Sequence, residues 1–498
     1  MRPIDYEVLG GFFVAMVVIG FVSVRKIKGP KDFFVGGGRV PWWLAGVSLH
    51  VSGYSGVIFV AMAGVAYRYG FTLYIWWALP SVLAAAVGVY AFAWRWAVLR
   101  LQLNIESPTE YLAVRYGVAT QQLIAWCGVT LKLFDVGAKW AALGILLHGF
   151  TGMPFAAAVL ISGGISLLYV TVGGLWADLY TDFAQFLVQL VAGLVLFVTV
   201  VRRLGGAGSI FGLWARLPAG HARPFNGPYT PWFVAGYILV STLSGNGGTW
   251  NQAIRFIAAP TGKSAIRSAW LSGALYLIWP LILFFPMWAG PLLVPKLSDP
   301  TQLYPILALK FLPPGLLGLS LAAMFAATMS MTTSDTNAIS AVITRDILPR
   351  LSGRFRQLDP RRRLQFARWS TLGFTGLTLV VGLEVSHFGG VIGLVVAWYG
   401  ALVGPIAIPM LCGLLPAFKH ADSTAAVLSI LAGLAAFVLA ACLQANVTWR
   451  VSAPILSSAA AFASMAWARR NSPVPDRVAS LMGALRRGAA LPESVNTL

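Results

Sequence analysis

Four polar side chains form a stripe in an otherwise apolar stretch of the chain. Ser330, Thr333, Ser334 and Asn337 are spaced i, i+3, i+4 and i+7, so in a helix they share one face. Their oxygens are the ligand type that a hard cation such as Na⁺ prefers. The hydroxyls could equally bond to carbonyls of the preceding turn or to a neighbouring helix. The stripe alone therefore leaves an ion site and helix packing equally open.

Asp182 supplies a carboxylate that favours the ion site. It starts a predicted apolar span within the run Tyr180 to Gln185. Because burial of a charged group in a membrane costs free energy, such a group indicates a functional site by default. Capping of a helix N-terminus is the alternative role for an aspartate at this place. The stripe and Asp182 together predict a partly charged cage for a cation.

Another charged group lies in an earlier span, where Lys132, Asp135 and Lys139 are spaced i, i+3 and i+7. It predicts either a polar lining that leaves one cation for an anionic solute, or a structural ion pair with a spare lysine that extends toward the membrane surface. We favour the ion pair.

Two glycine-rich runs interrupt apolar segments at matching places, SGYSG at residues 52–56 and SGNGG at residues 244–248. Glycine clusters favour unwinding because glycine loses the most backbone entropy in a helix. Paired interruptions of this kind indicate a binding site at the membrane midplane of a transporter. Close helix packing is the other use of glycine in membrane helices, and it explains one run better than a matched pair.

The elements that position these residues are membrane helices. The chain of 498 residues is 58% apolar and only 10% charged, whereas about a quarter of the residues of a soluble protein are charged. A bilayer core needs about 20 apolar residues per helix. Thirteen stretches meet this length, at about 6–24, 41–67, 71–99, 120–147, 153–172, 181–201, 230–254, 268–292, 314–344, 366–384, 388–415, 425–443 and 449–468.

The basic residues predict the orientation. Of 36 Lys and Arg residues, 25 fall on one side of the membrane if the loop after the first span is cytoplasmic. We therefore expect a multi-pass protein of the cell (inner) membrane, with its N-terminus outside and its C-terminus in the cytoplasm. The net charge of +20 then reflects topology in a lipid bilayer, and no nucleic-acid partner is expected. No catalytic residues are evident either, so we do not expect an enzyme.

Several motifs resemble one family of transporters. They are Gly36 to Arg39, Ser48 to Tyr67, Tyr180 to Gln185, Asn251 to Arg255, Ala326 to Asp346 and Gly404 to Gly413. Over about residues 35–420 the chain is similar to the sodium/solute symporters, which include carriers of glucose, proline, iodide and sialic acid. The resemblance implies an all-α fold with a LeuT-like core of two inverted five-helix repeats. It divides the chain into an N-terminal helix and loop (1–40), the ten-helix core (41–420), two C-terminal helices (421–468) and a cytoplasmic tail (469–498).

The resemblance also implies two sodium sites. Four residues match the usual site: Val51, Tyr54, Ala327 and Ser330. Met331 replaces a second hydroxyl there, and a thioether is a poor ligand for Na⁺. Either Thr328, Thr332 or water completes the site, or coupling in this protein departs from the family norm. Four residues match the second site in full: Asp182, Ser330, Thr333 and Ser334. The sequence therefore supports the second site better.

The resemblance further implies an aromatic, weakly polar solute pocket. Six residues are expected to line it: Tyr54, Trp76, Trp77, Asn246, Asn251 and Trp398. Trp76 and Trp77 stand where sugar carriers have polar side chains, and Gly53 stands where proline carriers have an aspartate. Neither glucose nor proline follows as the solute.

These features predict a secondary active symporter with alternating access. It would couple inward flow of Na⁺, the coupling ion, to uptake of a small organic solute of the sugar, sugar acid, carboxylate or amino acid type, with no other cofactor or metal. A proton-coupled carrier of the same fold and a transporter-like solute sensor are the alternatives. Solute uptake into proteoliposomes under a Na⁺ gradient or a pH gradient separates the three.

Overall fold

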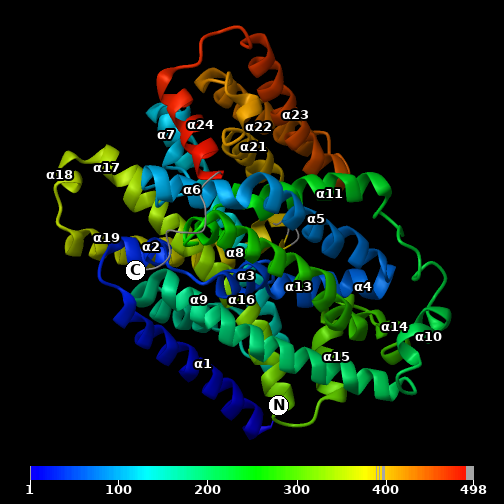
Figure 1. The fold of residues 1–498 in the computed structure, drawn as a ribbon. Helices are drawn as coiled ribbons and strands as arrows, with labels where there is room; N and C mark the ends of the chain where they lie inside the picture. The colour runs from blue at the N-terminus through cyan, green and yellow to red at the C-terminus, as the bar shows by residue number, and fades with distance from the viewer. Residues whose placement is uncertain (1, 389, 392, 395–398, 490–498) are drawn as a thin grey trace.

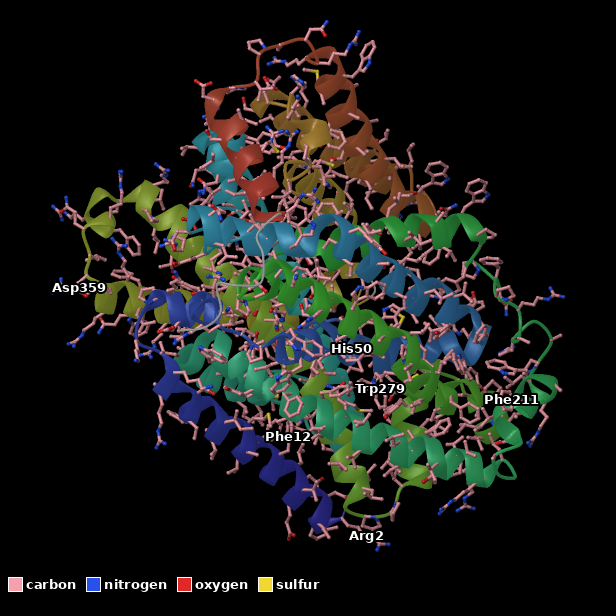
Figure 2. All side chains as sticks on the ribbon, viewed as in Figure 1. Arg2, Phe12, His50, Phe211, Trp279 and Asp359 are labelled. Atoms are coloured by element: carbon pink, nitrogen blue, oxygen red, sulfur yellow. The ribbon has the colours of Figure 1, made fainter. Side chains whose placement is uncertain are left out.

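The computed structural model describes residues 2–388, 390–391, 393–394 and 399–489. This part of the chain is built of helices that run between two ends of the molecule (Figure 1). The short helices α17 (Leu348–Leu351) and α18 (Gly353–Arg356) lie at one end, and α10 (Ser209–Arg216) lies at the other. Figure 2 places His50 in the interior between Asp359 and Phe211, which mark these two ends.

Seven helices are long and apolar enough to cross a membrane, judged by length and composition among the described residues. They are Pro3–Lys26, Tyr74–Leu103, Gly173–Arg203, Gly262–Leu293, Leu316–Leu351, Ser423–Cys442 and Val447–Ala468. The number becomes eight if Val118–Thr151 and Phe155–Leu167, which meet at 117°, form one span. The predicted number of thirteen is thus not confirmed. Broken helices account for part of the difference, because a half such as Ile58–Tyr69 is too short to qualify alone.

Both predicted helix breaks are present. α3 (Trp42–Val51) ends at the first glycine-rich run, and the helix resumes in a π-helical turn, η3 (Ile58–Met62), followed by α4 (Ala63–Tyr69). α11 (Pro231–Leu243) passes through the π-helical turn η6 (Ser244–Gly248) into α12 (Asn251–Ile257). Gly247 (φ +102°) and Trp250 (φ +74°) have left-handed backbone angles that no α-helix contains.

The centre of the bundle is α16 (Leu316–Val342), which is buried along almost its whole length. It packs against α8 (Val118–Thr151), α9 (Phe155–Arg203) and α19 (Pro360–Leu383), and α1 (Pro3–Ser23) covers α9 and α16 from outside. α9 kinks at Gly174 (φ +49°), where a Cβ would lie 2.6 Å from the carbonyl oxygen of Phe33. The kink divides α9 into two limbs. The helix is continuous from the residue after the kink to Asp182.

The remaining helices complete the core and its C-terminal additions. α5 (Leu79–Val87), α6 (Ala93–Leu103) and α13 (Gly262–Trp288) enclose the two broken helices. α21 (Gly404–Cys412) connects the core to the pair α22 (Ser423–Cys442) and α23 (Val447–Ala468) at the top of Figure 1. The tail forms an amphipathic helix, α24 (Asp476–Ala489), whose apolar face packs on α6 and α7 (Tyr111–Arg115).

Candidate functional site

Asp182 lies inside a helix, two turns beyond the kink at Gly174. Its side chain is fully buried, and its backbone is helical on both sides. Capping is therefore excluded as its role, and the predicted start of this span at residue 181 was too late. The predicted spans left residues 173–180 outside the membrane helices, but the structure makes residues 175–180 the first turns of the second limb of α9.

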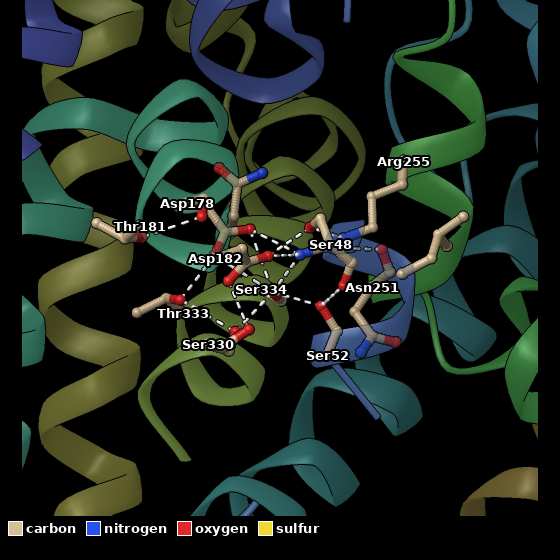
Figure 3. A network of polar contacts seen from close by, with 12 residues as sticks. Ser48, Ser52, Asp178, Thr181, Asp182, Asn251, Arg255, Ser330, Thr333 and Ser334 are labelled. Atoms are coloured by element: carbon tan, nitrogen blue, oxygen red, sulfur yellow. Dashed lines mark hydrogen bonds and ion pairs between the residues drawn. The ribbon is translucent and has the colours of Figure 1, made fainter. Parts of the chain in front are cut away.

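The predicted ion ligands gather on two carboxylates rather than one (Figure 3). The Ser330 hydroxyl donates a hydrogen bond of 2.5 Å to Oδ1 of Asp182. The Thr333 hydroxyl donates at 2.6 Å to Oδ1 of Asp178, and the Ser334 hydroxyl lies 3.2 Å from both oxygens of Asp178. All five side chains are buried. The stripe on α16 and the acidic face of α9 thus form one polar site.

Asp178 was not anticipated from the sequence. It precedes Asp182 by one helical turn, so the two carboxylates share a face of α9. The i, i+4 spacing would have revealed the pair if the residues after Gly174 had been predicted as helical. Asn337, the fourth member of the stripe, lies outside this site and donates from Nδ2 to the carbonyl oxygen of Phe34 at 3.4 Å.

Arg255 completes the site from α12. Its Nη2 lies 2.9 Å from Oδ2 of Asp178 and 3.2 Å from Oδ2 of Asp182, and it also donates to the Ser334 hydroxyl. Its Nε donates at 2.7 Å to the hydroxyl of Ser48 on α3, which in turn donates to Asp182. The sequence suggested a cytoplasmic loop for Arg255, but its side chain is fully buried. Only the fold could show which helix supplies this cation.

The charges of the site do not balance. Two carboxylates and one guanidinium leave one net negative charge in a site that is closed to solvent. A buried charge without compensation costs several kcal/mol. One monovalent cation or one proton would neutralise the site. Carboxylate and hydroxyl oxygens are suitable ligands for a hard cation such as Na⁺.

The residues of the other expected sodium site lie where α3 breaks beside α16. The N–H of Gly56 donates at 2.7 Å to the hydroxyl of Thr328, which links the break to α16. Val51, Tyr54 and Ala327 are buried. The hydroxyl of Ser330, however, is directed to Asp182. Thr332 donates to the carbonyl oxygen of Thr328 at 2.9 Å.

A cavity of about 110 Å³ lies between the two broken helices. Half of the residues that were expected to line the solute pocket line this cavity. Trp77, Asn246 and Asn251 line it, together with Met331. Tyr54 is fully buried, with its ring centroid 5.1 Å from that of Trp77.

Trp76, the neighbour of Trp77, faces a different space. It stacks on Tyr229 (ring centroids 5.1 Å apart) and lines an apolar cavity of about 580 Å³ with Phe233 and Val447. Trp398 lies outside the described residues.

The lysines of α8 belong to a buried network with α16. Nζ of Lys132 lies 2.9 Å from Asp135 and 2.6 Å from Asp335, and Nζ of Lys139 lies 2.9 Å and 2.6 Å from the same two carboxylates. All four side chains are at most 4% exposed. The expectation of a spare lysine at the membrane surface was wrong, because Asp335 supplies the second carboxylate from a distant part of the sequence.

Buried charges beside two broken helices, in a bundle of apolar helices, are typical of secondary transporters. Residues 33–433 match the model of the sodium:solute symporter family, and the chain belongs to this family. It is accordingly a Na⁺-coupled symporter of a small solute, with the LeuT-like fold.

Individual relatives agree with the family. The chain is 27% identical over 463 residues to the sodium/sialic acid symporter SiaT of Proteus mirabilis, with 88% of this chain and 89% of that protein covered. It is 30% identical over 405 residues to the human sodium/iodide cotransporter, with 78% and 61% covered.

Solved structures agree in fold. A Na⁺-coupled sialic acid symporter, described in a substrate-bound outward-open state, matches with a TM-score of 0.82 at 23% identity, over 94% of this chain and 98% of that one. Mhp1, a nucleobase-cation-symport-1 family transporter, matches with a TM-score of 0.58 at 13% identity, over 92% and 98%.

Proposed function

We propose that the coupling Na⁺ binds among Asp182, Ser330, Thr333 and Ser334, and that the solute binds in the cavity beside Trp77. The single observation that carries the ion site is the gathering of these four residues around buried carboxylates that keep one net negative charge. A bound Na⁺ removes that charge and finds only oxygen ligands. We further propose that the protein lies in the inner membrane of the cell. The basic end of the bundle, at α17 and α18, then faces the cytoplasm.

Two helices connect the ion to the solute cavity. Ser48 of α3 contacts Asp182, and Ser52, which caps the C-terminus of α3 one turn later, lines the cavity. On α12, Arg255 contacts Asp182, and its Nη1 donates at 2.9 Å to the carbonyl oxygen of Asn251, which lines the cavity one turn earlier. A cation that changes the contacts of Ser48 and Arg255 therefore shifts both cavity walls. This is how binding of the ion would favour one arrangement of the solute site.

Thermal unfolding of the purified protein tests the ion site. NaCl should raise the Tm relative to choline chloride at equal ionic strength, because a ligand at one hundred times its Kd stabilises by about 2.7 kcal/mol. Asp182→Asn and Ser330→Ala should lose most of this shift. Ser340→Ala is the matched control, since Ser340 is buried on α16 and donates to the carbonyl oxygen of Ala367 instead. Full Na⁺ stabilisation of Asp182→Asn would show that the ion binds elsewhere.

Uptake into proteoliposomes separates Na⁺ coupling from proton coupling. The net negative charge would also be removed by a proton, so a pH gradient is the informative comparison. Uptake should follow an imposed Na⁺ gradient and persist when the pH gradient is collapsed. Uptake that follows the pH gradient and ignores Na⁺ would assign the charge to a proton.

A further inference from the structure

The walls of the cavity between the broken helices are uncharged. They come from the break after α3, from α5, from η6 and α12, from α13 and from Met331 of α16. Among the described residues that line the cavity there is no Asp, Glu, Lys, Arg or His. Arg255, one turn beyond Asn251, directs its guanidinium to Asp178, Asp182 and two hydroxyls instead.

Two amide oxygens of the cavity wall have no partner. Asn246 uses its Nδ2 on the carbonyl oxygens of Ala84 (3.1 Å) and Thr242 (2.7 Å), and its buried Oδ1 accepts no hydrogen bond. Gln252 directs its Nε2 to the carbonyl oxygen of Leu49 (3.4 Å), and its Oε1 is likewise buried and unpartnered. Reversing the Asn246 amide would set its oxygen against two carbonyls, so its orientation is fixed.

The hydroxyls of the wall add further acceptors. Ser81 and Ser244 donate to carbonyl oxygens of the preceding turn, at 2.9 Å and 2.8 Å. Thr249 donates at 3.0 Å to Oδ1 of Asn251, which leaves the Asn251 amide as a donor. Each of these hydroxyls has used its only hydrogen and retains lone pairs. These groups of the wall therefore offer hydrogen-bond acceptors.

On the premise of the proposed function, we infer that the solute is a compact, uncharged molecule with hydroxyl or amide hydrogens, and that a small movement of the wall on binding brings the buried Asn246 Oδ1 and Gln252 Oε1 within reach of them. An unpaired acceptor left buried is unfavourable, and a donor from the solute satisfies it. An anion would face these oxygens without a cation to pair with, and a cation would find no carboxylate in the wall. Trp77 and Tyr276 present aromatic surface to an apolar face of the solute. The volume of about 110 Å³ is below the range of roughly 300–1,000 Å³ for drug-sized ligands.

Pairs of solutes that differ in charge test this inference. Lactamide and lactate, glycerol and glycerate, and glucose and glucuronate are added to the purified protein in saturating NaCl, and the Tm is measured. At least one neutral member should raise the Tm, and its anionic partner should bind at least tenfold more weakly. An anion that binds as well as its neutral partner would overturn the inference. The inference would also be overturned if no neutral member raised the Tm while Na⁺ alone stabilised the protein.

One variant ties the preference to the cavity. Gln252→Leu should weaken binding of the active neutral solute about tenfold, because a donor of the solute loses its acceptor, while the shift caused by Na⁺ alone stays. Gln252→Met serves if the leucine variant does not fold, and unchanged solute binding in the variant that folds would contradict the inference. Ser429→Ala is the control, since Ser429 pairs with Ser458 in the C-terminal helices. If NaCl did not raise the Tm of wild type, the proposed ion site would be contradicted instead. The preference for neutral over anionic solutes would then be measured without Na⁺.

Discussion

The guanidinium of Arg255 lies 3.2 Å from the carboxylate of Asp182. The cation of α12 thus already contacts the carboxylate that Na⁺ would bind. Asp178 lies 2.9 Å from the same guanidinium nitrogen. If Na⁺ binds as proposed, both cations are attracted to the same pair of aspartates, and Arg255 sets how strongly the site attracts Na⁺.

Removal of Arg255 should make the protein depend more on Na⁺. In Arg255→Gln two buried carboxylates lose the guanidinium that pairs with both of them, which should cost about 3–5 kcal/mol of unfolding free energy without Na⁺. Because the site then has a larger negative charge, NaCl should raise the Tm of the variant more than that of wild type. Arg255→Lys should be intermediate, since lysine keeps the charge but lacks the forked donors that reach Ser48 and both aspartates. A smaller Na⁺ shift in Arg255→Gln would mean that Arg255 supports the ion and does not compete with it.

Local spacing was sufficient to predict which hydroxyls of α16 share a face. The i, i+3 and i+4 positions of Ser330, Thr333 and Ser334 define a helix face whatever the fold, and the cost of a charged group inside a membrane singled out Asp182. The two helix breaks were predicted for a similar reason, because a glycine cluster disfavours a helix locally.

What the sequence did not show is which helices face each other. Arg255 and Ser48 reach Asp182 from α12 and α3, and Asp335 lies 203 and 196 residues along the chain from the two lysines of α8 that it contacts. No periodicity within one helix contains that information. The number of spans stays a prediction, because length and hydropathy describe a broken helix poorly.

Glu106 gives the protein a pH-dependent stability outside the membrane spans. It lies in the loop between α6 and α7, only 4% exposed and 3.6 Å from Arg345. Burial raises the pKa of its carboxyl, and Arg345 offsets part of this increase. The folded state therefore holds the proton to higher pH than the unfolded chain does. The stabilisation from protonated Glu106 is complete below its unfolded pKa of about 4.3 and is lost as the pH rises through the folded pKa.

Unfolding measured across pH 4 to 8 checks this contribution. Wild type should lose stability relative to Glu106→Gln as the pH rises, because glutamine needs no proton to stay neutral. Glu7→Gln, at an exposed carboxyl, is the control and should follow wild type. A constant difference between wild type and Glu106→Gln over this range would show that Glu106 does not titrate differently in the folded state.

The network of Lys132, Asp135, Lys139 and Asp335 should be held together by its balance of charge. Asp335→Asn leaves two buried lysines with one carboxylate, which should cost about 3–5 kcal/mol of unfolding free energy. The double variant Lys139→Met with Asp335→Asn restores one lysine to one carboxylate and should regain much of that loss. Chemical denaturation of the two single variants and the double variant gives the interaction energy directly.

The same network should influence Na⁺ binding without contact to the ion. Asp335 follows Ser334 on α16, so its two ion pairs to α8 fix the rotation that turns the Ser334 hydroxyl toward Asp178. Asp335→Asn should therefore weaken Na⁺ stabilisation as well as the fold, and the double variant should recover part of both. Asp5→Asn is the matched control, because Asp5 is a buried aspartate that holds α16 through the N–H groups of Gly315 and Gly318. If Asp5→Asn and Asp335→Asn reduce the Na⁺ shift equally, general destabilisation explains the effect and the positioning role of Asp335 is refuted.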